Sequence, residues 1–600
     1  MSEPGKPETV DAGESGMPAD HSEAAVRVIA QGSVPAGEPP DVDDVVPSGH
    51  SEPDDPAPSA AGSWSPKTRS SSPSRYGASS PRTALFAVLA ATFMFGAFCL
   101  TFALNTPPFL SPDEPQQFDR VMAAAHGNLL PDAGELMMSA GTLGAQGFYD
   151  KNDMVGSNPP KSWADYVPSL RTDRPSYNQL GGNSRAATAA ANYMSQHPPL
   201  YYAVVGAGVW LLPSADDMHA DALLMLIRLF NVLLVLPVPF LLYRASAALI
   251  GNSPIAYAAA FAPLLVPGLA RSAGSINNDN LAILLGCAVL ALCMVVAQGD
   301  RSLRTAAWLA GLCIAGSLVK GTVLTVLAIV PLAYGLSAIR SRSLPKRGTM
   351  LVLALGAAGA ATWWIRNELA IGSFQPNGYG HDAAGLAGAM APVRPPGVGV
   401  NYEYFADTVL RLFPGRFWGA LGLLEPPSLP GFMVTVASVV MIIAALFAVI
   451  VLRHRRWQVL LALLAPTVAL TVMLLNSLSH YQHSLAIAGV QGRYLYPGIF
   501  GLTLPMVLLG AALLGRLWKW IPVLVIGLGG LISGWAVYVS AQFYWLPRGR
   551  ALVPSDWAQA LHTAAGFAPF PAAVTGILLV LCAAALLGGA TVAVLLTAQN

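Results

Sequence analysis

Thirteen apolar stretches separated by polar segments dominate the chain after residue 80. About twenty apolar residues cross the hydrocarbon core of a bilayer as a helix, and most of these stretches reach that length. The pattern therefore predicts an all-α polytopic integral membrane protein. The stretches are 84–104, 199–213, 221–243, 254–270, 281–297, 305–319, 321–338, 349–365, 431–452, 457–475, 494–515, 520–541 and 572–597.

The distribution of arginine and lysine indicates how many of these stretches cross. Cytoplasmic loops are enriched in basic residues, yet with thirteen crossings the clusters at 340–347 and 453–456 would face outward. The stretch 199–213 makes only about 23 Å of helix against a core of about 30 Å. If it lies at the outer interface without crossing, these clusters become cytoplasmic. We therefore predict 12 transmembrane helices, with both termini cytoplasmic.

The same topology places the long loops on the external face. They include a large first external loop at 105–220, which carries interfacial helices, and a second loop at 367–430. Binding and catalytic residues are concentrated on loops, so we expect the protein to work at this face. Composition rich in Ala and Gly suggests the cell (plasma) membrane of a bacterium.

Composition excludes several classes of protein. The chain is 54% hydrophobic and 11% charged, whereas soluble proteins contain about 25% charged residues. A nucleic-acid binder, a secreted disulfide scaffold and a cytosolic enzyme are excluded. The five cysteines all lie in apolar segments without metal-ligand spacing, so we expect small core residues.

Residues 1–80 differ from the rest of the chain. They hold thirteen acidic and five basic residues and are rich in Pro, Ser and Gly. Such a segment buries too little apolar surface to fold alone. We expect a disordered acidic cytoplasmic tail, either a docking segment or a solvated spacer, ahead of a transmembrane domain at 81–600.

Candidate carboxylates follow the first apolar stretch and recur in a short external turn. Asp113 and Glu114 are adjacent, and together they could bind a divalent cation (Mg or Mn), or one could act as general base. The alternative is a capping box with Ser111 as N-cap and Glu114 at N3. Asp279 could complete a metal or acceptor site, or cap the helix beginning near Leu281.

Basic and aromatic residues near the outer helix ends could bind an anionic substrate. Arg493 is the strongest candidate for binding such a substrate, because a guanidinium binds phosphate in a bidentate manner. Similar positions are occupied by Lys320, Arg271, Arg228 and Arg366. As an alternative, each of these bases could only extend its charged group to the lipid headgroups. His197 could contact substrate or metal, or could be solvated or merely capping. Trp418 lies in an aromatic segment that could cover a lipid-linked substrate or serve as a membrane anchor.

Five motifs in order carry a resemblance to a known family. They are PDE at 112–114, HPPLYY at 197–202, SINNDN at 275–280, FWGALG at 417–422 and QGRYLYP at 491–497. Over about residues 84–540 the chain resembles a bacterial family of predicted multi-pass membrane proteins, described as a domain of unknown function. That family is in turn similar to the type C (GT-C) polyprenyl-phosphate-sugar glycosyltransferases. Gln117 stands where the family usually has His, and Leu423 where an aromatic residue is common.

The resemblance implies a GT-C-like membrane glycosyltransferase (hexosyl- or pentosyltransferase). It would move a sugar from a polyprenyl-phosphate donor to a cell-envelope glycan or lipid acceptor on the external face, with inversion. Asp113 would be the general base, and Glu114 would assist it or bind a cation. Arg493, with Lys320 or Arg271, would neutralise the lipid phosphate. The remaining substrate-binding residues would be His197, Asp279 and Trp418, with the isoprenoid tail near the FWG segment.

Two other functions fit the same features. A transporter or flippase of a lipid-linked or anionic solute would share the basic residues. In a non-enzymatic envelope assembly protein, the carboxylates would only cap helices. We expect no nucleic-acid partner.

Overall fold

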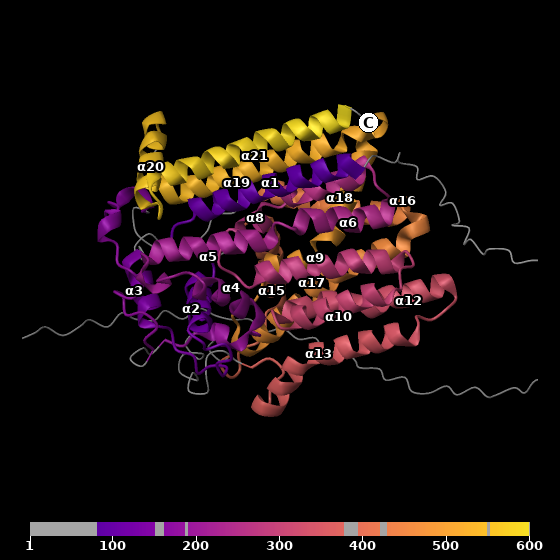
Figure 1. Cartoon of the computed structure of the whole chain (residues 1–600), viewed down its shortest axis with the longest axis horizontal. Coiled ribbons are helices and arrows are strands. Elements are labelled where there is room, and N and C mark those ends of the chain that lie inside the picture. Colours follow the sequence, from indigo (N-terminus) through magenta and orange to yellow (C-terminus); the bar gives the residue numbers. More distant parts are fainter. Residues whose placement is uncertain are drawn as a thin grey trace, which may run out of the picture. The chain divides into compact units, whose positions relative to one another are not determined.

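The structure is a computed structural model that describes residues 81–149, 161–185, 190–376, 394–420, 429–548 and 552–598. Within these ranges the regular structure is helical, with two isolated β-bridges and no strand (Figure 1). This confirms the all-α polytopic fold. The predicted tail at 1–80 and Leu423 lie outside the described residues.

Each apolar stretch predicted to cross is helical in the structure. The helices are α1 (Pro81–Asn105), α5 (Ala220–Val235), α6 (Val238–Ile250), α7 (Pro254–Phe261), α8 (Pro267–Ala273), α9 (Asp279–Ala297), α10 (Leu303–Ser317), α11 (Leu324–Leu327), α12 (Ile329–Ser341), α13 (Arg347–Ile371), α16 (Gly431–Val451), α17 (Arg456–Ser484), α18 (Ile499–Leu514), α19 (Ile521–Trp545) and α21 (Ala572–Ala598).

The number of crossings is only partly determined by these helices. Nine helical stretches in the described part could cross a membrane, or up to ten if the pair around Val266, bent by 68°, is one span. One of the nine, Gly492–Trp545, contains both α18 and α19, and α10 has only 15 residues. The count of twelve therefore stays a prediction.

The stretch expected not to cross forms α4 (Leu200–Trp210), with only 11 residues. This is about 17 Å of helix, too short for a core of about 30 Å. The other helices outside the apolar stretches are α2 (Glu114–Ala125), α3 (Ala140–Tyr149), α15 (Tyr402–Trp418) and α20 (Pro554–Phe567).

Helix α9 packs against α5, α6, α10, α12 and α17, and 78% of its apolar span is buried, against 17% for α16 and α21. The latter two helices therefore form lipid-facing walls. Figure 1 shows α1, α19 and α21 side by side, in mutual contact. Small residues permit such close approach: a Cβ on Gly274, at the end of α8, would lie 2.7 Å from the Cys99 carbonyl of α1. All five cysteines are buried, as predicted.

The first loop is itself a folded layer built around a buried carboxylate. Asp119 of α2 accepts hydrogen bonds from Ser139, Thr142 and Asn192 and pairs with Arg185. These bonds satisfy a charge that would otherwise be costly to bury. They also fix α2 against the rest of the first loop.

The last loop is tied to the first by arginine. Arg171 and Arg174 donate to backbone carbonyls at the end of α20, including those of Ala565 and Ala568. Cationic side chains at a helix C-terminus satisfy its unpaired carbonyls and its dipole. The two loops predicted to be external therefore lie on one side of the described chain.

Candidate active site

Asp113 lies where the chain turns from α1 into α2. Its φ of 61° is in the left-handed region that non-glycine residues rarely adopt, and its side chain makes no capping bond. Oδ1 instead accepts a hydrogen bond from the Tyr193 hydroxyl at 2.8 Å, and Oδ2 lies 2.6 Å from Nη2 of Arg493. The capping-box alternative is therefore wrong. Strained backbone of this kind is concentrated at functional sites.

Glu114 has a different environment from its neighbour. It is fully buried, and its two oxygens accept from Nε and Nη2 of Arg228 at 2.8 and 2.6 Å. Arg228 also donates to the carbonyls of Ala103, Thr106 and Pro107 at the end of α1. Arg228 therefore engages both Glu114 oxygens, and the expectation that Glu114 assists catalysis or binds a cation stays a prediction.

The expected divalent cation has no ready-made site beside these carboxylates. No group of three or more His, Cys, Asp or Glu side chains in the described residues is arranged to hold a metal ion. Asp113 has both oxygens engaged by Tyr193 and Arg493. The pair Asp113 and Glu114 therefore does not present two free carboxylates to one ion.

Four charged side chains form a chain of alternating sign. Arg493 pairs through Nη2 with Asp113 and lies through Nε 2.9 Å from Oδ2 of Asp279. The other oxygen of Asp279 accepts from Lys320 Nζ at 2.7 Å. Each buried charge thus has an opposite charge in contact, which offsets its desolvation. Asp113 is the accessible member, with 28% of its side chain exposed against 8% or less for the others.

Three separate elements bring this charged chain together. Asp279 is the first residue of α9, Lys320 lies between α10 and η7 (Gly321–Val323), and Arg493 lies in η9 (Gly492–Gly498). The structure thus unites Asp113, Asp279, Lys320 and Arg493, all of which the sequence had selected. Asp279 does not cap α9, since its carboxylate is ion-paired and the N-cap is Asn278.

The electrostatics leave Asp113 ionised and His197 neutral at neutral pH. Burial raises the pKa of Asp113, but Arg493, Tyr193 and Lys320 outweigh it, so the pKa lies below its ordinary 3.8. Burial, reinforced by the charge of Lys320, lowers the pKa of His197 from 6.5 to about 3. The imidazole therefore offers one N–H donor and one acceptor.

A layer of neutral polar residues supports the charged chain, and sequence reasoning missed most of it. Asn278 accepts from Lys320 Nζ at 3.2 Å and lies 3.5 Å from Nε2 of Gln117, whose Oε1 accepts from the Tyr202 hydroxyl. Gln117 and Asn278 lie within or next to the sequence motifs given above, and this position could have identified them as site residues. Tyr193, the partner of Asp113, lies outside these motifs, and no sequence pattern marks it as a site residue.

A cavity of about 500 Å³ reaches the charged chain at Lys320. His197, Lys320 and Tyr494 line its polar end, and the side walls are largely apolar. A second cavity of about 450 Å³, lined almost wholly by apolar side chains of α10 to α13, adjoins it. The two cavities share Leu324, Ala328, Trp364 and Phe374. Together they form an amphipathic space, charged at one end and apolar along its length.

Trp418 and Arg271 do not line this space. Trp418 is buried and donates through Nε1 to Ser438 at 2.9 Å, while Arg271 donates to the carbonyl of Gly419 at 3.0 Å. The expected substrate contacts of Trp418 and Arg271 stay predictions, since both side chains are engaged within the protein. A Cβ on Gly492 would lie 2.3 Å from the Cα of Phe417. The FWG segment therefore packs directly against η9 and positions Arg493.

A family model described as "Predicted membrane protein (DUF2142)" matches residues 95–502. No curated protein sequence matches the chain.

Solved structures with a similar course of the chain include ArnT from Cupriavidus metallidurans bound to undecaprenyl phosphate. It is 15% identical, with a TM-score of 0.38 over 84% of this chain and 77% of that chain. The oligosaccharyltransferase of Archaeoglobus fulgidus in the apo form is 12% identical, with a TM-score of 0.37 over 79% and 57%. At these scores neither likeness supports an argument about ligand or reaction.

Proposed function

Because the chain belongs to the family described as "Predicted membrane protein (DUF2142)", and because of its site, we propose that it is a membrane glycosyltransferase. It would transfer a sugar from a polyprenyl-phosphate donor to a cell-envelope acceptor. The observation that carries the proposal is the pairing of an accessible, ionised Asp113 with buried Arg493, beside an amphipathic cavity that ends at Lys320.

The shape and chemistry of the cavity fit the proposed donor. A polyprenyl phosphate has an anionic head and a long apolar chain, and the space offers Lys320 and His197 at one end and apolar walls elsewhere. Neutral His197 can donate a hydrogen bond to a phosphate oxygen without adding charge. We therefore place the isoprenoid chain between α10, α11, α13 and α17, instead of near Trp418.

The reaction is a single inverting displacement at the anomeric carbon. The acceptor hydroxyl attacks and its proton passes to Asp113, while the bond from the anomeric carbon to the phosphate oxygen breaks. The electron pair leaves with the lipid phosphate, where Lys320 and Arg493 stabilise the charge that develops. Tyr193 keeps the carboxylate oriented toward the acceptor.

The ion pair also makes the base dependent on the donor. A carboxylate held by a guanidinium is a weak base, because the charge that lowers its pKa also holds it ionised. A donor phosphate bound near Lys320 would compete with Asp113 for Arg493. Asp113 would then be released from Arg493 and become a stronger base only when a donor is bound. It would therefore not act as a base in the absence of donor.

The test is a transfer assay on purified protein in lipid nanodiscs. It would supply hexosyl and pentosyl polyprenyl phosphates with envelope-glycan and lipid acceptors, with and without EDTA. We expect Asp113→Asn to lower turnover by about 100-fold or more, the range of general-base contributions. Asp173→Asn, which alters an exposed aspartate of the same loop, should leave turnover unchanged.

Two results would contradict the proposal. Turnover of Asp113→Asn equal to that of the wild type would remove Asp113 from catalysis. Donor binding without transfer, together with movement of the lipid across the bilayer, would favour the flippase. Loss of activity in EDTA alone would restore the divalent cation expected from the sequence, with a site outside the Asp113 and Glu114 pair.

A further inference from the structure

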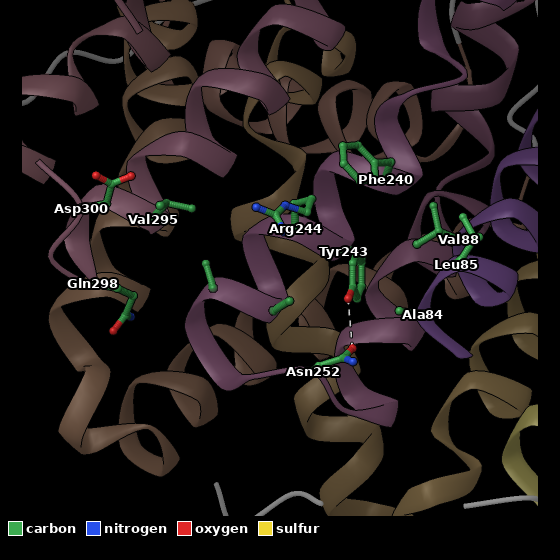
Figure 2. A pocket seen from close by; sticks show the side chains of 12 residues that line it. Ala84, Leu85, Val88, Phe240, Tyr243, Arg244, Asn252, Val295, Gln298 and Asp300 are labelled. Carbon is green, nitrogen blue, oxygen red and sulfur yellow. Dashed lines mark hydrogen bonds between the residues drawn. The ribbon is translucent and has the colours of Figure 1, made fainter. Parts of the chain in front are cut away.

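Another cavity, with charged walls, lies at the opposite ends of the membrane helices. Its volume is about 740 Å³, within the range of about 300–1,000 Å³ typical of small-molecule sites. It is formed by the start of α1, by α6 from Phe240 onward, by the end of α9, and by residues that directly follow α6 and α9 (Figure 2).

This cavity is separate from the candidate active site. Helix α9 begins at Asp279 in the charged chain and reaches the cavity at Val295, sixteen residues or about 24 Å further on. Helix α1 connects the two regions in the reverse direction, from Leu85 in the cavity to Asn105 near α2. The cavity therefore opens at the other membrane face, predicted to be cytoplasmic.

Arg244 is an unpaired cation in this cavity. In the part of the chain that the structure describes, its guanidinium has no hydrogen bond or ion pair, and Figure 2 shows it extending into the space beside α9. Beside it, the Tyr243 hydroxyl donates to Oδ1 of Asn252 at 3.0 Å. Arg244 is exposed and follows the apolar stretch 221–243, where a guanidinium without a protein partner faces lipid headgroups or an aqueous cavity. A phosphate would supply the missing partner, since a guanidinium can hold two of its oxygens.

The opposite side of the cavity carries a negative charge. Asp300 accepts hydrogen bonds from the Ser302 amide at 2.9 Å and the Thr305 hydroxyl at 2.7 Å. Burial raises the pKa of Asp300, but these bonds outweigh it and hold the pKa below its ordinary value. Asp300 forms no ion pair with Arg244 among the described residues. A ligand that carries both signs of charge can therefore satisfy both walls.

The rim toward the bilayer is apolar. Leu85 and Phe240 line the cavity and are exposed on the surface, and Val88 lies behind them. Exposed apolar side chains on a membrane helix face lipid, so acyl chains can lie against them while a headgroup enters the cavity.

We propose that this cavity binds an aminophospholipid from the leaflet at this face. The phosphate diester would lie on Arg244, the ammonium group at Asp300, and the acyl chains along Leu85 and Phe240. The bound lipid would link α1, α6 and α9 at the ends remote from Asp113. A polyprenyl phosphate shares the phosphate chemistry, but it has no amine and its second negative charge would face Asp300.

The experiment measures retained lipid by native mass spectrometry of the full chain. Phosphatidylethanolamine, phosphatidylglycerol and a polyprenyl phosphate would be added in turn to delipidated protein, and the melting temperature recorded with each. We expect phosphatidylethanolamine to bind about tenfold more tightly than the other two and to raise the melting temperature. This comparison uses the wild type and does not depend on how a variant folds.

Two matched variants test the role of Arg244. Arg244→Gln should weaken phosphatidylethanolamine binding about tenfold and abolish the rise in melting temperature. Arg304→Gln removes the same charge from an exposed position at the start of α10, outside the cavity, and should change neither the binding nor the melting temperature.

Equal losses in both variants would show only general attraction to headgroups and overturn the proposal. Equal or tighter binding of phosphatidylglycerol would refute recognition of the amine, and preference for the polyprenyl phosphate would reassign the cavity to the carrier lipid.

Discussion

Asp113 and Glu114 are neighbours in sequence, and their side chains have opposite environments. Asp113 is partly exposed and shares Arg493 with Asp279, whereas Glu114 is fully buried and bound to Arg228. Removing a carboxylate from the first position leaves Arg493 still paired with Asp279. Removing it from the second leaves a buried arginine without its counter-charge.

We expect Glu114→Gln to destabilise the protein by about 3–5 kcal/mol, because it breaks a buried ion pair on one side only. Asp113→Asn should leave the melting temperature close to that of the wild type. The double change Glu114→Leu with Arg228→Met should recover part of the loss, since it removes both charges. Thermal unfolding in detergent measures all three, and a stable but inactive Glu114→Gln protein would return Glu114 to catalysis.

The neutral state of His197 predicts a pH dependence of stability. The unfolded chain takes up a proton at His197 below about pH 6.5, but the folded protein does so only near pH 3, because burial lowers the pKa. The unfolded state binds more protons in this window, so stability is complete above pH 6.5 and falls with acidification.

Since His197 is partly accessible, we expect a loss of up to about 1 kcal/mol per pH unit below pH 6.5. Melting temperatures from pH 7.5 to 4.5 measure it. His197→Gln should flatten this slope, while His562→Gln, at an exposed position on α20, should not. Identical slopes in all three proteins would mean that His197 titrates normally.

At the scale of elements, backbone contacts position the charged side chains. Segment η9 carries Arg493, and it lies so close to α15 that no side chain fits at Gly492. Tyr496 of the same segment donates to the Phe417 carbonyl at 2.6 Å. Phe417 of the motif FWGALG thus packs against Gly492 and Tyr496 of the motif QGRYLYP, and this contact supports the segment that carries Arg493.

We expect Gly492→Ala to cost about 1–3 kcal/mol through overpacking and to lower transfer at least tenfold, because Arg493 must shift with η9. Gly415→Ala in α15 is the matched control, since a Cβ there meets nothing within 4 Å. Melting temperature and turnover are the two readouts. Wild-type activity in Gly492→Ala would mean that the contact does not position Arg493.

At the scale of the whole molecule, the described membrane helices carry different chemistry at their two ends. One end holds the charged chain and the loop layer tied by Arg171 and Arg174 to α20. The other holds the short basic connectors and the cavity around Arg244. The positive-inside rule predicts that the first end is external and the second is cytoplasmic.

Cysteine labelling tests this orientation. Val167→Cys lies in the first loop and Leu344→Cys between α12 and α13, both at exposed positions, while the five native cysteines are buried. A membrane-impermeant maleimide should label Val167→Cys in intact spheroplasts, and Leu344→Cys only after permeabilisation. The reverse pattern would invert the topology and place Asp113 in the cytoplasm.

The sequence by itself determined the all-helical membrane architecture and predicted that the helix of the stretch 199–213 is too short to cross. A long apolar run has essentially one way to satisfy its backbone in a bilayer, which is a helix, and a run too short to span cannot cross. The ordered motifs also contain Asp113, Asp279 and Arg493, and the position of Lys320 near an outer helix end selected it as a base.

Only the tertiary structure decided which partner each charge has. Arg228 binds Glu114 across 114 residues and Arg493 binds Asp113 across 380, and no local pattern encodes such pairings. The burial of Trp418, the contact of Tyr193 with Asp113 and both charged cavities likewise arise where separate helices meet. Periodicity and spacing describe one segment at a time, whereas a binding site is formed by the side chains of several segments once packing has brought them together.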